Sequence, residues 1–104
     1  MNAGEYPPLN VLCINWFEKK TEYKGHIQPI RIEQESGEVH HVKKVRHHSF
    51  HRQGITIQHQ FVVSTKEGDY LELFLDTKTL TWRLTQMQTN DGVWKKFHSP
   101  MKRI

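Results

Sequence analysis

The segment IQHQFVVSTKEGDYLELFL, residues 57–75, determines the fold that we expect for this chain. On each side of Lys66-Glu67-Gly68, apolar and polar side chains alternate with the period of a β-strand that has one buried face; the alternation begins at Ile55. A three-residue loop ending in glycine predicts a hairpin. A two-residue loop would instead turn the carboxylate of Glu72 toward the core. The predicted pairs are His59 with Leu75, Phe61 with Leu73, and Val63 with Leu71.

A second hairpin is predicted directly after the first. Asp76-Thr77-Lys78-Thr79 suits a type I turn, because Thr and Lys disfavour the positive φ angles of the primed turns. This turn places Leu75 opposite Leu80 and keeps apolar side chains on one face of the ladder. The other predicted pairs are Leu73 with Trp82, Leu71 with Leu84, and Glu72 with Arg83 on the outer face.

Two strands are expected in the N-terminal part of the chain. Residues 9–17 are rich in apolar and β-branched residues and are interpreted as a mostly buried strand, followed by a charged loop at residues 18–25. Three isoleucines within residues 27–32 indicate the next strand. Pro29 within it marks a sheet edge or an irregular residue.

The stretch that follows is ambiguous. Glu35-Ser36-Gly37 predicts a three-residue hairpin loop that sets Ile30 opposite Val42. Across residues 38–48, however, valines recur at every third position, which fits one stripe of a helix or a strand with a bulge. We favour the bulged strand, because a hairpin signal precedes it and four histidines lower its helix propensity.

The composition agrees with an all-β fold. Val, Ile and Thr supply 22 residues against a single Ala, which nearly excludes a helical bundle. Asn90-Asp91-Gly92 predicts a turn before a last strand at residues 93–98. We therefore expect six or seven short antiparallel strands in a meander that forms a small barrel or sandwich. Residues 1–8 are expected to form an extended arm, and residues 9–104 a single small β domain.

Several functional classes have no support in the sequence. The longest uncharged apolar run, residues 11–14, is far shorter than the roughly 20 residues of a membrane span, and no signal sequence is recognised. The single cysteine, Cys13, cannot form an internal disulfide and is expected to act as a small hydrophobe. No catalytic motif is found. We expect a soluble cytoplasmic protein with no enzymatic activity, no cofactor and no membrane contact.

The histidines raise two separate hypotheses. His47, His48 and His51 invite a metal site, but adjacent histidines on a strand point to opposite faces, and no acid lies between Glu38 and Glu67, so no metal site is predicted. His59 interrupts an apolar row. We interpret it as a core histidine satisfied by one hydrogen bond, and the alternative is a residue that lines a pocket at an open barrel mouth.

The charge is unevenly distributed along the chain. Its net value is +4, yet residues 39–66 hold five bases and no acid, residues 67–91 hold five acids and two bases, and residues 92–104 hold four bases and no acid. Six of the eight histidines also lie within residues 39–66, so mild acidification would raise the charge of that segment. The chain therefore has two cationic segments separated by an acidic one.

Both cationic segments combine bases with aromatic rings, the parts from which single-strand nucleic-acid sites are built. We predict contact with RNA or single-stranded DNA through Lys43, Lys44, Arg46, Phe50, Arg52, Trp94, Lys95 and Lys96. A simpler interpretation is a solvated sheet edge on which lysines discourage aggregation. The alternative function is a protein-interaction or self-assembly module, in which an exposed strand edge pairs with another protein or a second copy.

Overall fold

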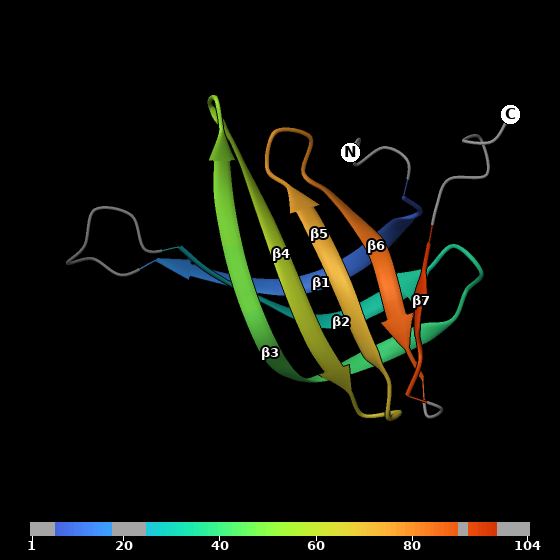
Figure 1. Ribbon diagram of the computed structural model, residues 1–104. Helices are drawn as coiled ribbons and strands as arrows, with labels where there is room; N and C mark the ends of the chain where they lie inside the picture. The colour runs from blue at the N-terminus through green and yellow to red at the C-terminus, as the bar shows by residue number, and fades with distance from the viewer. Residues whose placement is uncertain (1–5, 18–24, 90–91, 98–104) are drawn as a thin grey trace, which may run out of the picture.

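The computed structural model describes residues 6–17, 25–89 and 92–97. Within these ranges the chain is all-β, a closed six-stranded antiparallel barrel with one further strand (Figure 1). The strands are β1 (Pro8–Phe17), β2 (Gly25–Gln34), β3 (Val39–Gln53), β4 (Thr56–Thr65), β5 (Tyr70–Asp76), β6 (Thr81–Gln88) and β7 (Trp94–Lys96). Their order in the sheet follows the sequence, so the predicted meander and small barrel are confirmed.

Some predicted segments fall outside the described residues. These are most of the arm at residues 1–8, which is described only from Tyr6, the charged loop at residues 18–24, the Asn90-Asp91 pair, and the chain after residue 97. The first strand begins at Pro8, one residue before the predicted start.

The barrel closes by the pairing of β1 with β6, the first and last of its six strands. Pro8 pairs with Arg83 and Leu9 with Trp82, and the Arg83 guanidinium donates a hydrogen bond to the carbonyl oxygen of Tyr6 at 2.7 Å. Farther along β6, residues 86–88 pair with β7. One edge of β6 is therefore shared between β1 and β7.

The two predicted three-residue loops that end in glycine, residues 35–37 and 66–68, are both present. All three predicted pairs between β4 and β5 are formed, including Phe61 with Leu73. Gly68 has a φ angle of 98°, and its N–H donates to the carbonyl oxygen of Thr65 at 3.1 Å. Gly37 has a φ angle of 94° in the loop between β2 and β3. In both loops the residue in the left-handed conformation is glycine, which has no Cβ to clash with the backbone. A glycine at the third loop position therefore predicts this kind of loop.

The predicted register between β5 and β6 is wrong by two residues. Residues 77–80 form a four-residue loop, in which the N–H of Leu80 donates to the carbonyl oxygen of Asp76 at 2.7 Å, and Leu75 pairs with Trp82. Leu80 lies in the loop, 77% exposed, with a φ angle of 58°. A leucine gives no sequence signal for the left-handed conformation, so the loop was missed. The other observed pairs are Leu73 with Leu84, Leu71 with Met87 and Glu72 with Gln86, where a bulge has intervened.

Residues 38–48 contain the favoured bulged strand and no helix. The ladder between β3 and β4 shifts twice, leaving Lys43 and Arg46 as extra residues. The bulge at Lys43 allows Val42 and Val45 to pack against the core although they are three positions apart, and the bulge at Arg46 brings His48 to the same face. Ile55, predicted to begin the inward row of β4, lies instead in the turn before β4 and is 96% exposed.

The first strand is less buried than its composition indicates. Leu9, Val11 and Cys13 pack against the core, whereas Leu12 and Ile14 are 61% and 53% exposed. One face of β1 therefore meets solvent despite its apolar side chains, and the predicted mostly buried strand is wrong.

The second strand shows both of the features that its proline suggests. Pro29 lies beside Ile30, the extra residue of a bulge opposite β1. The ladder with β3 ends at the pair of Arg31 with His41, before the predicted pair of Ile30 with Val42. The first part of β2 is thus a local sheet edge, where a missing N–H does no harm.

The core consists of apolar side chains on the inward faces of the strands. They are Ile32, Phe61, Val63, Leu71, Leu73, Leu75, Trp82 and Leu84. The rings of Phe61 and Trp82 lie 5.3 Å apart between centroids. Each such side chain stabilises the fold by about 1.5–3 kcal/mol relative to exposure.

Candidate functional site

A row of outward side chains crosses the five strands β3 to β7 of the sheet. Side chains alternate between faces along a strand, so the neighbours of buried residues point outward. The paired residues of the row are Lys44, Ser64, Tyr70, Gln88 and Trp94, on β3 to β7 in that order. At about 4.8 Å between strands, the row spans about 19 Å along the sheet. It joins the two predicted cationic segments.

A cleft of about 210 Å³ opens at the β3 end of this row. Lys43 and Arg46, the bulge residues of β3, line it together with Lys44. The rest of the lining consists of Ser64, Thr65, Gly68, Asp69 and Tyr70. Three cations and several hydroxyl groups make the cleft suitable for an anion such as a phosphate, although Asp69 adds one carboxylate.

The predicted residues of β7 divide between the two faces of that strand. Lys96 pairs with Gln86, which pairs with Glu72, so these residues form a second outward row. Lys95 pairs with Met87 in the adjacent inward row. The Glu72 carboxylate accepts hydrogen bonds from the side chains of Gln60, Thr85 and Gln86. The outer wall is therefore not uniformly cationic.

Phe50 and Arg52 do not join the cleft. Phe50 pairs with His59, and Arg52 pairs with Ile57, both on the inward row of β4. Phe50 is 63% exposed near the end of the hairpin formed by β3 and β4. The structure thus brings Lys43, Lys44 and Arg46 together and places Phe50 and Arg52 on the other face of β3.

His59 belongs to a cluster of rings at the inner face of β3 and β4. It is 3% exposed, and its Nδ1 lies 2.9 Å from Nε2 of His48, a hydrogen bond in which one ring donates and the other accepts. The His48 ring stacks on Phe61, with centroids 4.2 Å apart. Burial lowers the pKa of both histidines. The charge of His47 lowers the pKa of His48 further, and that of His48 lowers the pKa of His59 further. The pair is therefore held neutral.

His41 holds the loop between β4 and β5 against β3. Its backbone N–H donates to Oε1 of Glu67 at 3.0 Å, and its ring Nδ1 lies 2.8 Å from Oε2. The hydrogen bonds from the His41 side chain and backbone lower the pKa of Glu67 to about 2. Glu67 therefore remains ionised across the physiological range.

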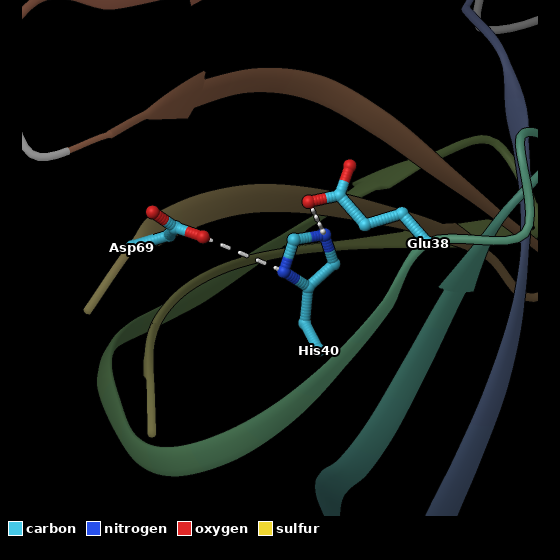
Figure 2. Close-up of side chains that lie close together, drawn as sticks. All are labelled: Glu38, His40 and Asp69. Carbon is cyan, nitrogen blue, oxygen red and sulfur yellow. Dashed lines mark ion pairs between the residues drawn. The ribbon is translucent and has the colours of Figure 1, made fainter. Parts of the chain in front are cut away.

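His40, the preceding residue, faces the interior between two carboxylates. Figure 2 shows the carboxylate of Asp69 near Nδ1 of His40 and that of Glu38 near Nε2, at 3.7 and 3.8 Å. His40 is 1% exposed, and its Nδ1 makes no hydrogen bond. The sequence offered a partial signal, since Glu38 and His40 are two residues apart and share a face of an extended chain. Asp69 comes from a distant loop, so the cluster was missed.

Cys13 has the surroundings of a structural cysteine. It is partly buried against the core, and burial raises the pKa of its thiol. Its Sγ–H donates to Oδ1 of Asn15 at 3.7 Å. A protonated thiol is a poor nucleophile.

Comparison with known proteins gives no relative from which residue roles could be transferred. No family model, no curated protein and no solved structure matches this chain. In the part of the chain that the structure describes, no helix is long and apolar enough to cross a membrane. A functional proposal therefore depends on the geometry of the surface alone.

Proposed function

We propose that this protein is a small non-enzymatic module that binds RNA or single-stranded DNA along its outer wall. The observation that carries the proposal is the row from Lys44 to Trp94, which has a lysine at one end, a tryptophan at the other and Tyr70 between them. Cations that follow phosphates, with rings on which bases stack, are the components of single-strand binding. A cytoplasmic location is part of the proposal, because the chain has a single cysteine.

The binding surface is smaller than the set of residues predicted from the sequence. Lys43, Lys44 and Arg46 would hold one phosphate in the cleft, and Tyr70 on its rim would stack on the adjoining base. Trp94 is 37% exposed and would stack on a base at the far end of the row. Phe50, Arg52 and Lys95 lie on the opposite face of the sheet and are left out of the surface.

A salt titration tests this proposal. Fluorescence anisotropy of labelled single-stranded RNA and DNA would be measured at two salt concentrations, about 50 and 200 mM. In the test variant Lys43, Lys44 and Arg46 are replaced by Ala. Loss of the one phosphate that these cations hold should weaken binding and flatten the slope of log affinity against log salt by about 0.7, which is the contribution of each neutralised phosphate on a single strand.

A variant of equal charge provides the control. Replacing Arg31, Arg52 and Lys78 by Ala also removes three exposed cations, but none of these residues lies in the cleft. This control variant should keep most of the affinity and the original slope. Equal losses in the two variants, or the absence of binding by the wild-type protein, would contradict the proposal.

A second candidate function, strand addition, is favoured by the seam between β2 and β3. Their ladder contains only three residue pairs, so among the described residues β3 beyond His41 has a ladder partner on its β4 side alone. Figure 1 shows the hairpin of β3 and β4 extending beyond the rest of the barrel. A second copy could extend this edge. Sedimentation equilibrium would then show a dimer that persists at high salt, and a monomer at all concentrations would exclude self-assembly.

A further inference from the structure

We propose that His40, Asp69 and Glu38 form a binding site for a divalent transition-metal ion such as Zn²⁺ or Co²⁺. One ring nitrogen of His40 and one oxygen from each carboxylate lie within 4.8 Å of one another. His40 lies at the start of β3, Glu38 in the loop before it and Asp69 in the loop between β4 and β5, and Figure 2 shows both carboxylates facing the His40 ring. The proposal does not rest on the proposed nucleic-acid function, although Asp69 also lines the cleft.

The strongest observation is the unpartnered nitrogen of His40. Its ring is 1% exposed, and Nδ1 is a buried polar atom without a hydrogen-bond partner. Buried polar groups are almost always hydrogen-bonded, because leaving one unsatisfied costs about 1–3 kcal/mol. A metal ion that accepts the Nδ1 lone pair removes this cost. The Asp69 carboxylate, 15% exposed, lies on the same side of the ring.

The distances suit a bridging ion better than a hydrogen bond. Nδ1 of His40 lies 3.7 Å from Oδ2 of Asp69, too far for a direct hydrogen bond. An ion about 2.1 Å from each atom would hold them roughly 3.4–3.6 Å apart at angles between tetrahedral and trigonal, close to the observed 3.7 Å. The Glu38 side chain is 55% exposed and its carboxylate lies 3.8 Å from Nε2, so it supplies the third ligand after turning toward the Nδ1 side of the ring. Three protein ligands leave a fourth position for water.

Gln34 orients the ring from the other side. Its side-chain Nε2 lies 2.8 Å from Nε2 of His40 and donates to Sδ of Met87 at 3.9 Å. Metal binding at Nδ1 requires the amide to rotate by 180°, so that its oxygen accepts from Nε2–H and the lone pair is left on Nδ1, facing Asp69. Histidine ligands in metal sites commonly donate their second ring N–H in this way.

The donor set selects the class of ion. Mg²⁺ and Ca²⁺ prefer oxygen ligands, whereas imidazole with carboxylates suits Zn²⁺ and its neighbours among the transition metals. Both carboxylates also offset the ion's charge. We therefore expect Zn²⁺ and Co²⁺ to bind, and Mg²⁺ to have no effect at the same concentration.

Asp69→Asn provides the test, with Glu67→Gln as the matched control. Both changes neutralise one carboxylate of the same loop, but Glu67 is bonded to His41 and lies outside the cluster. Calorimetric titration with Zn²⁺, visible absorption of Co²⁺ and thermal unfolding with and without Zn²⁺ would be compared for the three proteins. The wild type and Glu67→Gln should bind one ion and unfold at a higher temperature with Zn²⁺. Asp69→Asn should bind more than about tenfold more weakly.

The remaining histidines require a specific readout, because exposed imidazoles bind metals weakly. Long-range ¹H–¹⁵N spectra of the histidine rings would show whether Zn²⁺ shifts Nδ1 of His40. A shift confined to His47, His48 or His51, equal affinity in Asp69→Asn and the wild type, or no thermal stabilisation by Zn²⁺ would each overturn the proposal.

Discussion

Leu84 and Leu80 test the observed register of β5 and β6. The pairing predicted from the sequence puts both leucines on the inner face, whereas the structure buries only one of them. Leu84 is 1% exposed and pairs with Leu73, while Leu80 is 77% exposed in the loop. Leu84→Ala removes three buried carbon atoms, which at about 0.8 kcal/mol each lowers the free energy of unfolding by about 2.4 kcal/mol. An unrelaxed cavity raises the loss to as much as about 5 kcal/mol.

Urea unfolding followed by tryptophan fluorescence measures both variants against the wild type. Leu84→Ala should lose a large share of a total stability of about 5–15 kcal/mol, and its transition should move to clearly lower urea. Leu80→Ala should stay within about 0.5 kcal/mol of the wild type, as exposed substitutions usually do. Equal losses for the two variants would show that Leu80 is buried and that the four-residue loop is wrong.

Three further predictions concern strain, acid stability and charge. Leu80→Asn should raise the free energy of unfolding by about 0.5–1 kcal/mol in the same urea assay, since Asn tolerates the left-handed backbone better than Leu. Because the pKa values of His48 and His59 are lowered by burial, the unfolded chain takes up protons first, so stability should be greatest above about pH 6.5 and fall below it. His48→Gln should flatten this fall in urea midpoints between pH 7.5 and 5. His47→Gln, on the outer face, should flatten it less, because His47 is the smaller of the two causes that lower the pKa of His48. Asp69→Asn should raise oligonucleotide affinity in metal-free anisotropy titrations, because Asp69 lines the cleft with a negative charge. Zn²⁺ should raise the affinity of the wild type but not of this variant, because Asp69 also faces His40 in the proposed metal site.

The fold could be predicted where glycine or alternation determines the local geometry. Gly68 identified a three-residue loop, and alternating side chains then fixed the pairs between β4 and β5. The loop before β6 could not be found, because its left-handed residue is Leu80. The burial of β1 was overestimated because apolar composition does not distinguish a strand with two buried faces from one with exposed Leu12 and Ile14.

The candidate site was predictable only in part, for a reason that lies in the bulges of β3. In a regular strand Lys44, Phe50 and Arg52 would share one face, since even separations keep side chains on the same side. The bulge at Arg46 reverses this relation, so Phe50 and Arg52 join the inward row instead. The cluster around His40 depends on a contact between two separate loops, which no local pattern reports.

The same bulges explain why the cations of β3 are crowded. Within residues 42–48, the inward positions are Val42, Val45 and His48, because these contact the core or stack on Phe61. The other four positions are Lys43, Lys44, Arg46 and His47. A regular strand of the same length with Val42 inward would have only three outward positions, so the two bulges together add one side chain to those that the wall presents to solvent. In this chain both added residues are bases, and both line the cleft. The period of three that made the segment ambiguous between helix and strand is thus the feature that concentrates positive charge beside Tyr70.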